Sequence, residues 1–365
     1  MNLSPFRDPA IAARLLEEIR AAQSRPLVIM ETCGGQTHAL LRLGLDQLLP
    51  RGLELVHGPG CPVCVTPVAL IDQAIALAGR PEVILATFGD MMRVPGSAST
   101  LFDARSAGGD VRMVYSALDA LELAQSNPER EVVFFAIGFE TTAPGSAQAA
   151  MQARSANTGN FSLLSAHVLV PPAVRFLLNS PENRVQGYLA AGHACAVLGW
   201  EPYENLAAEF HVPIVVTGFE AVDLLRGILR VVQLLEANEA RVENAYERVV
   251  RWEGNPRARA GMEQVFRICD REWRGIGLIP ASGLTLQPEY AAWDAQEKFG
   301  PPAAAQTAAG VCISGLVLQG LKKPTACPAF GRECTPAHPL GAPMVSGEGA
   351  CAAYYTYQRM PEGRE

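Results

Sequence analysis

Short apolar segments alternate with glycine-bearing loops and amphipathic stretches along the first two thirds of the chain. Apolar side chains recur at helical spacing within residues 8–22, at Ile11, Leu15, Leu16 and Ile19, and predict a helix. Six apolar runs predict strands, and loops with glycine follow most of them. The runs cover residues 26–30, 82–86, 111–115, 131–136, 162–170 and 212–216. This alternation favours an α/β fold in which parallel sheets are covered on both faces.

The pattern also predicts three domains. Repeated strand ends, Phe-Gly-Asp at residues 88–90 and Gly-Phe-Glu at 138–140 and 218–220, suggest two similar α/β domains. We assign residues 26–125 to the first of these domains and residues 126–237 to the second. Residues 1–25 and 238–365 are assigned to a third domain, mostly helical and rich in cysteine.

Four elements are predicted for the third domain. They are helices at residues 240–252 and 257–271, a short strand pair within 275–287, and an Ala-rich helix that follows Pro302 and ends near residue 321. A Pro-, Gly- and Cys-rich tail at residues 322–357 completes the assignment.

Composition narrows the class of protein. The 365 residues are 49% apolar and 18% charged, which is typical of a globular chain with a large core, and the net charge of −7 argues against a nucleic-acid partner. No apolar run reaches the roughly 18–20 residues of a membrane span, and the N-terminus has no signal-peptide pattern. We therefore expect a cytoplasmic protein without membrane contact. Nine cysteines in such a compartment indicate metal ligands or redox groups more than structural disulfides.

Three cysteines form the first candidate site. Cys61 and Cys64 flank two residues in a Gly/Pro-rich turn, and a helix over residues 66–78 is predicted to follow, with Thr66 as its N-cap. Cys33 lies in a similar setting, at a strand end ahead of Gly34 and a helix. Helix N-termini favour thiolates, and loops at the ends of strands in one sheet can meet, so three thiolates could converge. The alternative is half of a structural zinc site or an incidental pair; zinc would take His38 or His57 as a further ligand.

The last four cysteines form the second candidate site. Cys312, Cys327, Cys334 and Cys351 are separated by 14, 6 and 16 residues. Four thiolates suit an iron–sulfur cluster or a zinc ion, and the wide spacing favours the cluster, with a disulfide as the third alternative. Two further cysteines, Cys195 and Cys269, are predicted to be buried small hydrophobes, the second of them on a helix.

Polar side chains in the loops after the strands complete the candidates. They are His38, Asp90, Arg93, Glu140, Thr141, Thr142 and Glu220. Asp90 and His38 could handle charge and protons near the thiols. The structural alternative is that the two glutamates cap helices and that Asp90 pairs with Arg93. His167 and His193 are expected to be core or loop histidines. The glycine-rich loops match neither the Walker nor the dinucleotide-binding pattern.

Several motifs together resemble the hydrogenase maturation factor HypD family. They are METCGGQTHA at residues 30–39, HGPGCPVC at 57–64, FGDMMRVPGS at 88–97, GFETTAP at 138–144, CPAFG at 327–331, CTP at 334–336 and MVSGEGACAAY at 344–354. The match covers roughly residues 26–357. Two positions depart from the pattern: Gln36 stands where some members have His, so we assign no iron ligation there, and Gly347 stands where Ser is common.

The resemblance implies a function, partners and cofactors. It implies a redox-active scaffold that builds the iron, cyanide and carbon monoxide centre of nickel–iron hydrogenases together with the small chaperone HypC, with cyanide coming from HypE. It implies a [4Fe–4S] cluster on Cys312, Cys327, Cys334 and Cys351, carried by a third domain beside two similar α/β domains. It also implies that Cys33, with Cys61 and Cys64 nearby, forms the iron-holding and thiol-redox site.

A mechanism follows from these expectations. Cys33 and a cysteine of HypC would hold the iron, because soft thiolates suit iron that carries cyanide and carbon monoxide. Cys61 and Cys64 would cycle between dithiol and disulfide, with electrons relayed by the cluster. Two alternatives belong to other classes: a general thiol–disulfide oxidoreductase, and a zinc-stabilised interaction scaffold without redox chemistry.

Overall fold

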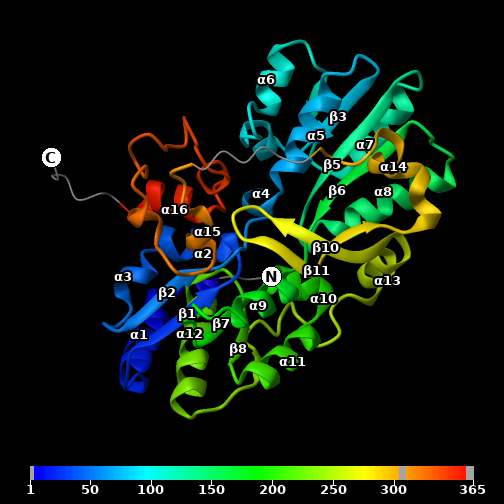
Figure 1. Cartoon of the computed structure of the whole chain (residues 1–365). Coiled ribbons are helices and arrows are strands. Elements are labelled where there is room, and N and C mark those ends of the chain that lie inside the picture. The colour runs from blue at the N-terminus through cyan, green and yellow to red at the C-terminus, as the bar shows by residue number, and fades with distance from the viewer. Residues whose placement is uncertain (1–3, 304–309, 359–365) are drawn as a thin grey trace.

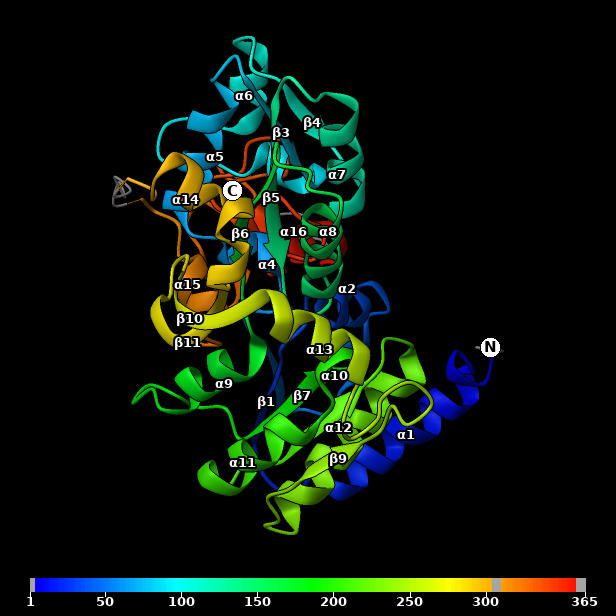
Figure 2. The same cartoon turned by 90° about the vertical axis from the view of Figure 1, so that its right-hand side faces the viewer.

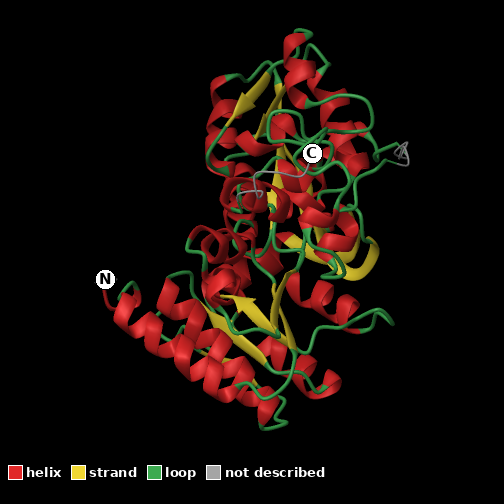
Figure 3. Cartoon of the chain, turned by 90° about the vertical axis from the view of Figure 1, so that its left-hand side faces the viewer, coloured by secondary structure: helices red, strands yellow, loops and turns green. Residues whose placement is uncertain are grey.

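The computed structural model of the chain describes residues 4–303 and 310–358. Its main elements are two parallel sheets with helices packed around them, as Figures 1 and 3 show. The predicted α/β class with parallel sheets is confirmed. The predicted Ala-rich helix falls partly on residues 304–309, outside the described residues, and the described remainder contains only the short helix α15, Ser314–Leu318.

Five parallel strands form the first sheet, in the order β2-β1-β7-β8-β9. They are β1 (Leu27–Glu31), β2 (Leu53–His57), β7 (Gly187–Ala191), β8 (Ile214–Thr217) and β9 (Val242–Asn244). Alternate side chains enter opposite cores: Ile29 packs with α1 (Pro9–Ala22) and α12 (Ala221–Glu236), whereas Met30 packs on the other face. Both faces are buried, as expected for parallel strands.

Four parallel strands form the second sheet, in the order β4-β3-β5-β6. They are β3 (Val83–Thr87), β4 (Val111–Met113), β5 (Glu131–Gly138) and β6 (Phe161–His167). Leu85 packs with α5 (Val68–Ala78) and α6 (Leu101–Ser106), whereas Ile84 packs with α7 (Ala117–Ser126) and α8 (Ala143–Ser155) on the opposite face. Figure 1 shows this sheet above the first one.

The two sheets do not follow the predicted division at residue 125. The chain leaves the first sheet after β2, completes the second sheet, and returns to the first at β7, which pairs with β1. Strands β2 and β7 are not among the six predicted strands. Pairing between strands that are far apart in the sequence leaves no local periodicity, so the apolar pattern alone could not reveal this order.

Residues beyond 238 contain more strand than predicted. The predicted helix at 240–252 is wrong, because this segment supplies β9 at the edge of the first sheet. The predicted helix at 257–271 ends at residue 265 as α13 (Pro256–Val265), and Cys269 lies on strand β10 (Phe266–Trp273). Strand β10 pairs with β11 (Gly277–Leu286), so the predicted strand pair is a single strand. Figure 2 shows this hairpin between the two sheets.

The C-terminal segment packs beside the first sheet. Its helix α16 (Ala350–Tyr357) contacts α2 (Gly34–Arg42), and Figure 1 shows the two together. The remaining elements are η1 (Ser4–Phe6), α3 (Leu45–Leu48), α4 (Pro62–Val65), η2 (Gly89–Arg93), α9 (Val170–Leu178), α10 (Gly192–Leu198), α11 (Glu201–Phe210), η3 (Pro288–Trp293), α14 (Ala295–Phe299), η4 (Pro324–Ala326) and η5 (Ala342–Met344). Among the described helices, none combines the length and the apolar character needed to cross a bilayer.

Candidate functional site

Cys33 lies directly after β1 and is the N-cap residue of α2. The amide of Gly34 donates a hydrogen bond of 2.8 Å to the carbonyl oxygen of Gly60, which precedes Cys61. A Cβ atom on Gly60 would overlap the backbone of Cys33, so the close approach of the two segments requires glycine there. The structure therefore brings the backbones of two predicted thiol segments, from the carboxyl ends of β1 and β2, into contact.

His193 is a neighbour of Cys33 that the sequence analysis missed. The Cys33 Sγ atom lies 3.7 Å from Nδ1 and 3.8 Å from Nε2 of His193. The imidazole stacks on the Phe219 ring, with centroids 5.2 Å apart. His193 follows β7, and β7 lies next to β1 only because of the unpredicted strand order. No local signal in the sequence could have identified this pair.

Burial decides the ionisation of Cys33. The side chain is 1% exposed, and this burial raises the pKa of the thiol well above its ordinary value. The backbone amides of Gln36 and Gly35 at the start of α2 act in the opposite direction, and the carboxylates of Glu31 and Glu348 raise the pKa further. Loss of hydration therefore outweighs the helix amides, and the direction of this shift opposes the thiolate that the helix N-terminus alone would favour.

Cys61 and Cys64 form a disulfide in the structure, and both are buried. Cys61 is the N-cap of the four-residue helix α4, and the amide of Cys64 lies 3.3 Å from its sulfur. The predicted helix start at Thr66 is wrong: α5 begins at Val68, and the Thr66 hydroxyl instead donates to the carbonyl oxygen of Pro62 over 2.9 Å. A sharp turn, and not the end of a long helix, presents this pair.

One pocket adjoins these segments, and three of the seven candidate polar residues line it: His38, Asp90 and Thr142. Glu348, which the sequence analysis did not single out, also lines it; burial chiefly, and then the charge of Asp90, raises the pKa of Glu348. Its walls come from the carboxyl ends of β1, β2, β3 and β5 and the short elements that follow them, including α2, α4 and η2, and from the segment before α16. The lining residues are Gly35, His38, Pro62, Val63, Phe88, Gly89, Asp90, Ile137, Thr142, Ser346, Gly347 and Glu348.

The two histidines considered as zinc ligands already have partners. His57 contacts a Glu31 carboxylate oxygen at 2.7 Å and the Tyr354 hydroxyl at 2.9 Å. His38 contacts the Gly347 carbonyl oxygen and the Tyr357 hydroxyl, both at 3.2 Å. Both nitrogens of each ring are thus engaged, which leaves neither ring free to complete a zinc site with the thiols.

The two candidate glutamates differ. Glu220 caps α12 and forms an ion pair with Arg7, as the structural alternative predicts. Glu140 is fully buried and accepts a hydrogen bond of 2.8 Å from the amide of Val170 at the start of α9. Burial raises the pKa of Glu140 to about 7. Glu140 therefore caps a helix from a distant loop and can titrate near neutral pH.

The four C-terminal cysteines line one small apolar pocket, together with residues such as Val317, Phe330 and Met344. We call it the cysteine pocket and define it by Cys312, Cys327, Cys334 and Cys351. Burial, and then the charges of the other three cysteines, raise the pKa of the Cys351 thiol. Within residues 4–303 and 310–358 no group of three or more His, Cys, Asp or Glu side chains has the arrangement of a metal site. The four thiols share a pocket and the right donor chemistry for a thiolate-bound cluster.

The other two cysteines lie elsewhere. Cys195 is buried in α10, as predicted. Cys269 is half-buried on β10, 3.6 Å from a guanidinium nitrogen of Arg271, so its predicted helical, buried setting is wrong.

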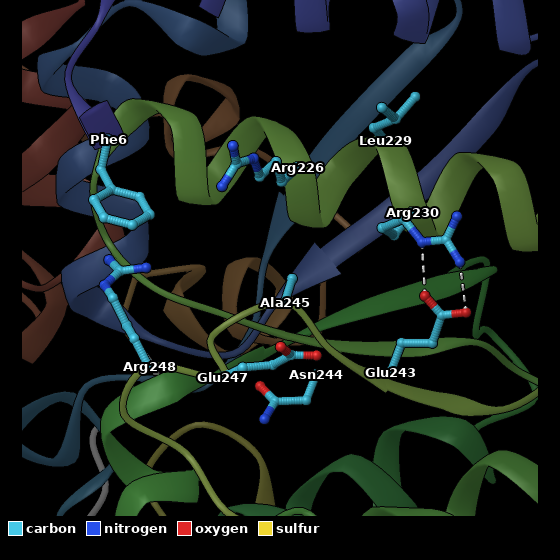
Figure 4. Close-up of a pocket in the computed structure, with 9 residues that line it drawn as sticks. All are labelled: Phe6, Arg226, Leu229, Arg230, Glu243, Asn244, Ala245, Glu247 and Arg248. Atoms are coloured by element: carbon cyan, nitrogen blue, oxygen red, sulfur yellow. Dashed lines mark hydrogen bonds and ion pairs between the residues drawn. The ribbon is translucent and has the colours of Figure 1, made fainter. Parts of the chain in front are cut away.

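A further pocket lies between η1, α12 and the loop after β9 (Figure 4). Its arginines already have partners: Arg230 forms an ion pair with Glu243 at 2.7 Å, and the Arg248 guanidinium lies 3.7 Å from the centroid of the Phe6 ring. None of the predicted site residues lines it. We therefore assign no function to it.

Fold and sites together define an α/β protein with two parallel sheets, a buried disulfide whose segment contacts the segment of a third buried cysteine, and a separate pocket of four cysteines. Residues 10–358 match the family described as "HypD: Hydrogenase formation hypA family". The chain is 50% identical to the hydrogenase maturation factor HypD of Rhodobacter capsulatus, with 97% of each chain covered. It is 46% identical to the HypD proteins of Escherichia coli K12 (97% of each chain covered) and Rhizobium leguminosarum bv. viciae (99% of this chain and 96% of the relative). The chain belongs to the HypD family of hydrogenase maturation factors.

Proposed function

We propose that this chain is the scaffold on which the iron–cyanide–carbon monoxide centre of a nickel–iron hydrogenase is assembled, in complex with a HypC chaperone and with cyanide from HypE. Family membership supports the role in hydrogenase maturation. The observation that carries the chemical part is the contact between the Cys33 segment and the segment of the Cys61–Cys64 disulfide.

In this proposal Cys33 is the ligand that this chain gives to the incoming iron. Burial raises the pKa of this thiol and so favours its protonated form, and the proton leaves as the sulfur–iron bond forms. His193 lies 3.7 Å from the sulfur and is placed by this geometry to take that proton as iron replaces it on the sulfur; burial lowers the pKa of the imidazole and so opposes a lasting charge there. His38 and Asp90 line the adjoining pocket, through which the iron and its ligands would approach.

The Cys61–Cys64 pair stores two electrons in this proposal. Reduction of the disulfide consumes two electrons and two protons and yields two thiols; oxidation returns them. Cys312, Cys327, Cys334 and Cys351 would hold a [4Fe–4S] cluster, which, when bound, supplies electrons one at a time. The shared pocket of the four thiols supports this assignment.

Removing the thiol of Cys33 tests the iron-binding role. A Cys33→Ala variant, purified without oxygen together with HypC, is expected to lose the infrared bands of iron-bound cyanide and carbon monoxide and to keep its iron–sulfur absorption. Cys195→Ala is the matched control, because it removes a buried cysteine outside both sites. Unchanged infrared bands in Cys33→Ala would exclude Cys33 as the iron ligand.

The disulfide also favours a second candidate function, a general thiol–disulfide oxidoreductase. Cys61 and Cys64 are only 2% and 1% exposed, so large disulfide substrates cannot reach them without a conformational change. Reduction of unrelated protein disulfides, independent of HypC and abolished in Cys64→Ser, would support this alternative. Stoichiometric zinc in a colourless protein would instead support an interaction scaffold.

A further inference from the structure

A buried chain of hydrogen bonds joins three segments of this molecule. It begins at Glu31, the last residue of β1, whose side chain is fully buried. One carboxylate oxygen accepts from the backbone amide of Cys33 at 2.8 Å, and the other contacts Nδ1 of His57 at 2.7 Å. The hydroxyl of Thr37 in α2 donates to that same second oxygen.

His57 extends the chain to the C-terminal helix. It is the last residue of β2, and its Nε2 atom lies 2.9 Å from the hydroxyl of Tyr354 on α16. An imidazole has two ring nitrogens, and in His57 one faces the carboxylate and the other faces the hydroxyl, so each nitrogen has one hydrogen-bonding partner. The exposed fractions are 0% for Glu31, 4% for His57 and 2% for Tyr354, so water does not compete for these hydrogen bonds.

This series of hydrogen bonds runs between the segments that carry the two cysteine sites. Glu31 holds the amide of Cys33, His57 lies four residues before Cys61, and Tyr354 lies one helical turn after Cys351. We propose that Glu31, His57 and Tyr354 are positioning residues that couple the cysteine pocket to Cys33, so that occupation of the pocket fixes α16 and, through α16, the segment that carries Cys33. The meaning of this coupling for assembly rests on the proposed function.

A second histidine–tyrosine pair on α16 provides a built-in control. Tyr357, one turn after Tyr354, contacts His38 with its hydroxyl at 3.2 Å, and the two rings meet edge to face. This pair is partly exposed and does not reach Glu31 or the Cys33 amide. Loss of a hydroxyl from the buried pair leaves the buried imidazole nitrogen without a partner, whereas water can replace the hydroxyl of the exposed pair.

The test measures how fast Cys33 reacts with iodoacetamide, by mass spectrometry of the full chain. Tyr354→Phe keeps the ring and removes the hydroxyl; it is expected to raise the alkylation rate of Cys33 about tenfold. Tyr357→Phe is expected to stay within about twofold of the unmodified chain. Cys195, buried in α10, reports global opening in the same sample and is expected to keep its rate. An equal rise at Cys195 and Cys33, or no rise in Tyr354→Phe, would overturn the proposal.

Two further measurements separate positioning from simple packing. Glu31→Gln is expected to raise the alkylation rate of Cys33 by itself. Tyr354→Phe added to it should have little further effect, because the series of hydrogen bonds is already interrupted. Fully multiplicative effects would contradict a connected chain. Reconstitution with iron and sulfide is expected to slow Cys33 alkylation in the unmodified chain and not in Tyr354→Phe; equal slowing in both would overturn the coupling.

Failure of this inference can be distinguished from failure of the proposed function. If the unmodified chain takes up no iron–sulfur cluster, the cluster assignment is wrong, but the rates of the as-isolated variants still test the hydrogen-bond chain. If the cluster forms and Tyr354→Phe behaves like Tyr357→Phe, the proposed function stands and the coupling is refuted.

Discussion

The two cysteine sites of this molecule are built in different ways. Cys33 and Cys61 lie near the carboxyl ends of neighbouring parallel strands, and hydrogen bonds and glycine contacts hold their backbones together. Three of the four residues of the cysteine pocket, Cys312, Cys327 and Cys334, lie outside the named helices and strands, and only Cys351 is in a helix. The first site is therefore preformed by the sheet, whereas the second is formed by turns around a pocket.

This difference suggests what each site contributes. If the first site receives and releases iron, as proposed, it needs fixed geometry before the iron arrives, and strand ends provide such geometry. A pocket that keeps a cluster can take part of its stability from the bound group, because ligand binding to thiolates adds to folding free energy. We expect substitutions in the cysteine pocket to act through the cofactor, and substitutions at the thiol site to act through packing and burial.

The largest effect is expected from loss of one of the proposed cluster ligands. Cys334→Ser should lower bound iron and sulfide after anaerobic reconstitution at least about tenfold, since a serine oxygen is a poor replacement for a thiolate in a four-thiolate set. Metal and sulfide analysis with the visible absorption spectrum measures this. Cys269→Ser, on the hairpin and outside the pocket, is the control. A fully loaded Cys334→Ser protein would remove this cysteine from the ligand set.

The next largest effect is a loss of folding stability, expected when backbone packing at the thiol site is disturbed. Gly60→Ala is expected to destabilise the fold by about 3 kcal/mol, because the added Cβ overlaps the backbone nitrogen and Cα of Cys33, which cannot move aside as a side chain can. Gly347→Ala, in the segment before Cys351, is expected to be nearly neutral, because a Cβ there meets no atom within 4 Å. Urea unfolding measures both. Equal costs would contradict the expected difference between a glycine in close backbone contact and a glycine with open space around it.

The sequence predicted the parts of this architecture that depend on local pattern. Apolar runs with glycine loops indicate the parallel α/β class, and the rule that loops gather at strand ends indicates that the Cys33 and Cys61 segments meet. Features that depend on distant pairing were missed, including the return of the chain at β7 and therefore the His193–Cys33 contact. Cys269 was misplaced because Val265 and Ile268 fit helical spacing, whereas pairing of β10 with β11 decides the structure.

The depth at which a side chain is buried is the other quantity that the local sequence pattern does not predict. Position at a helix N-terminus favours a thiolate for Cys33, but the depth of the site reverses the direction of its pKa shift. The burial of Glu140 could not be predicted from the local pattern either. The motif around it suggests a helix cap, and only the structure shows a fully buried carboxyl that caps α9 from another loop.

The effect of burial on a titratable group can also be tested at Glu140, through the pH dependence of folding stability. Burial raises its pKa from 4.5 to about 7 in the folded chain. Between these values the unfolded chain has lost the proton and the folded chain still holds it, so its contribution to stability falls as pH rises from about 4.5 to about 7 and is constant above. The difference corresponds to roughly 3 kcal/mol, which is an upper bound for the gain when the charge is removed.

Glu140→Gln is therefore expected to match the unmodified chain in unfolding free energy below pH 4.5 and to exceed it by at most roughly 3 kcal/mol at pH 8. Urea unfolding at both pH values measures the gain. His167, whose pKa burial lowers to about 3, makes stability rise with pH, but it is present in both proteins and cancels from their difference. Glu333→Gln, on an exposed turn between Cys327 and Cys334, is the matched control and should show no such divergence. A constant difference between Glu140→Gln and the unmodified chain across this range would mean that Glu140 does not titrate there, and that burial of its carboxyl does not set its protonation.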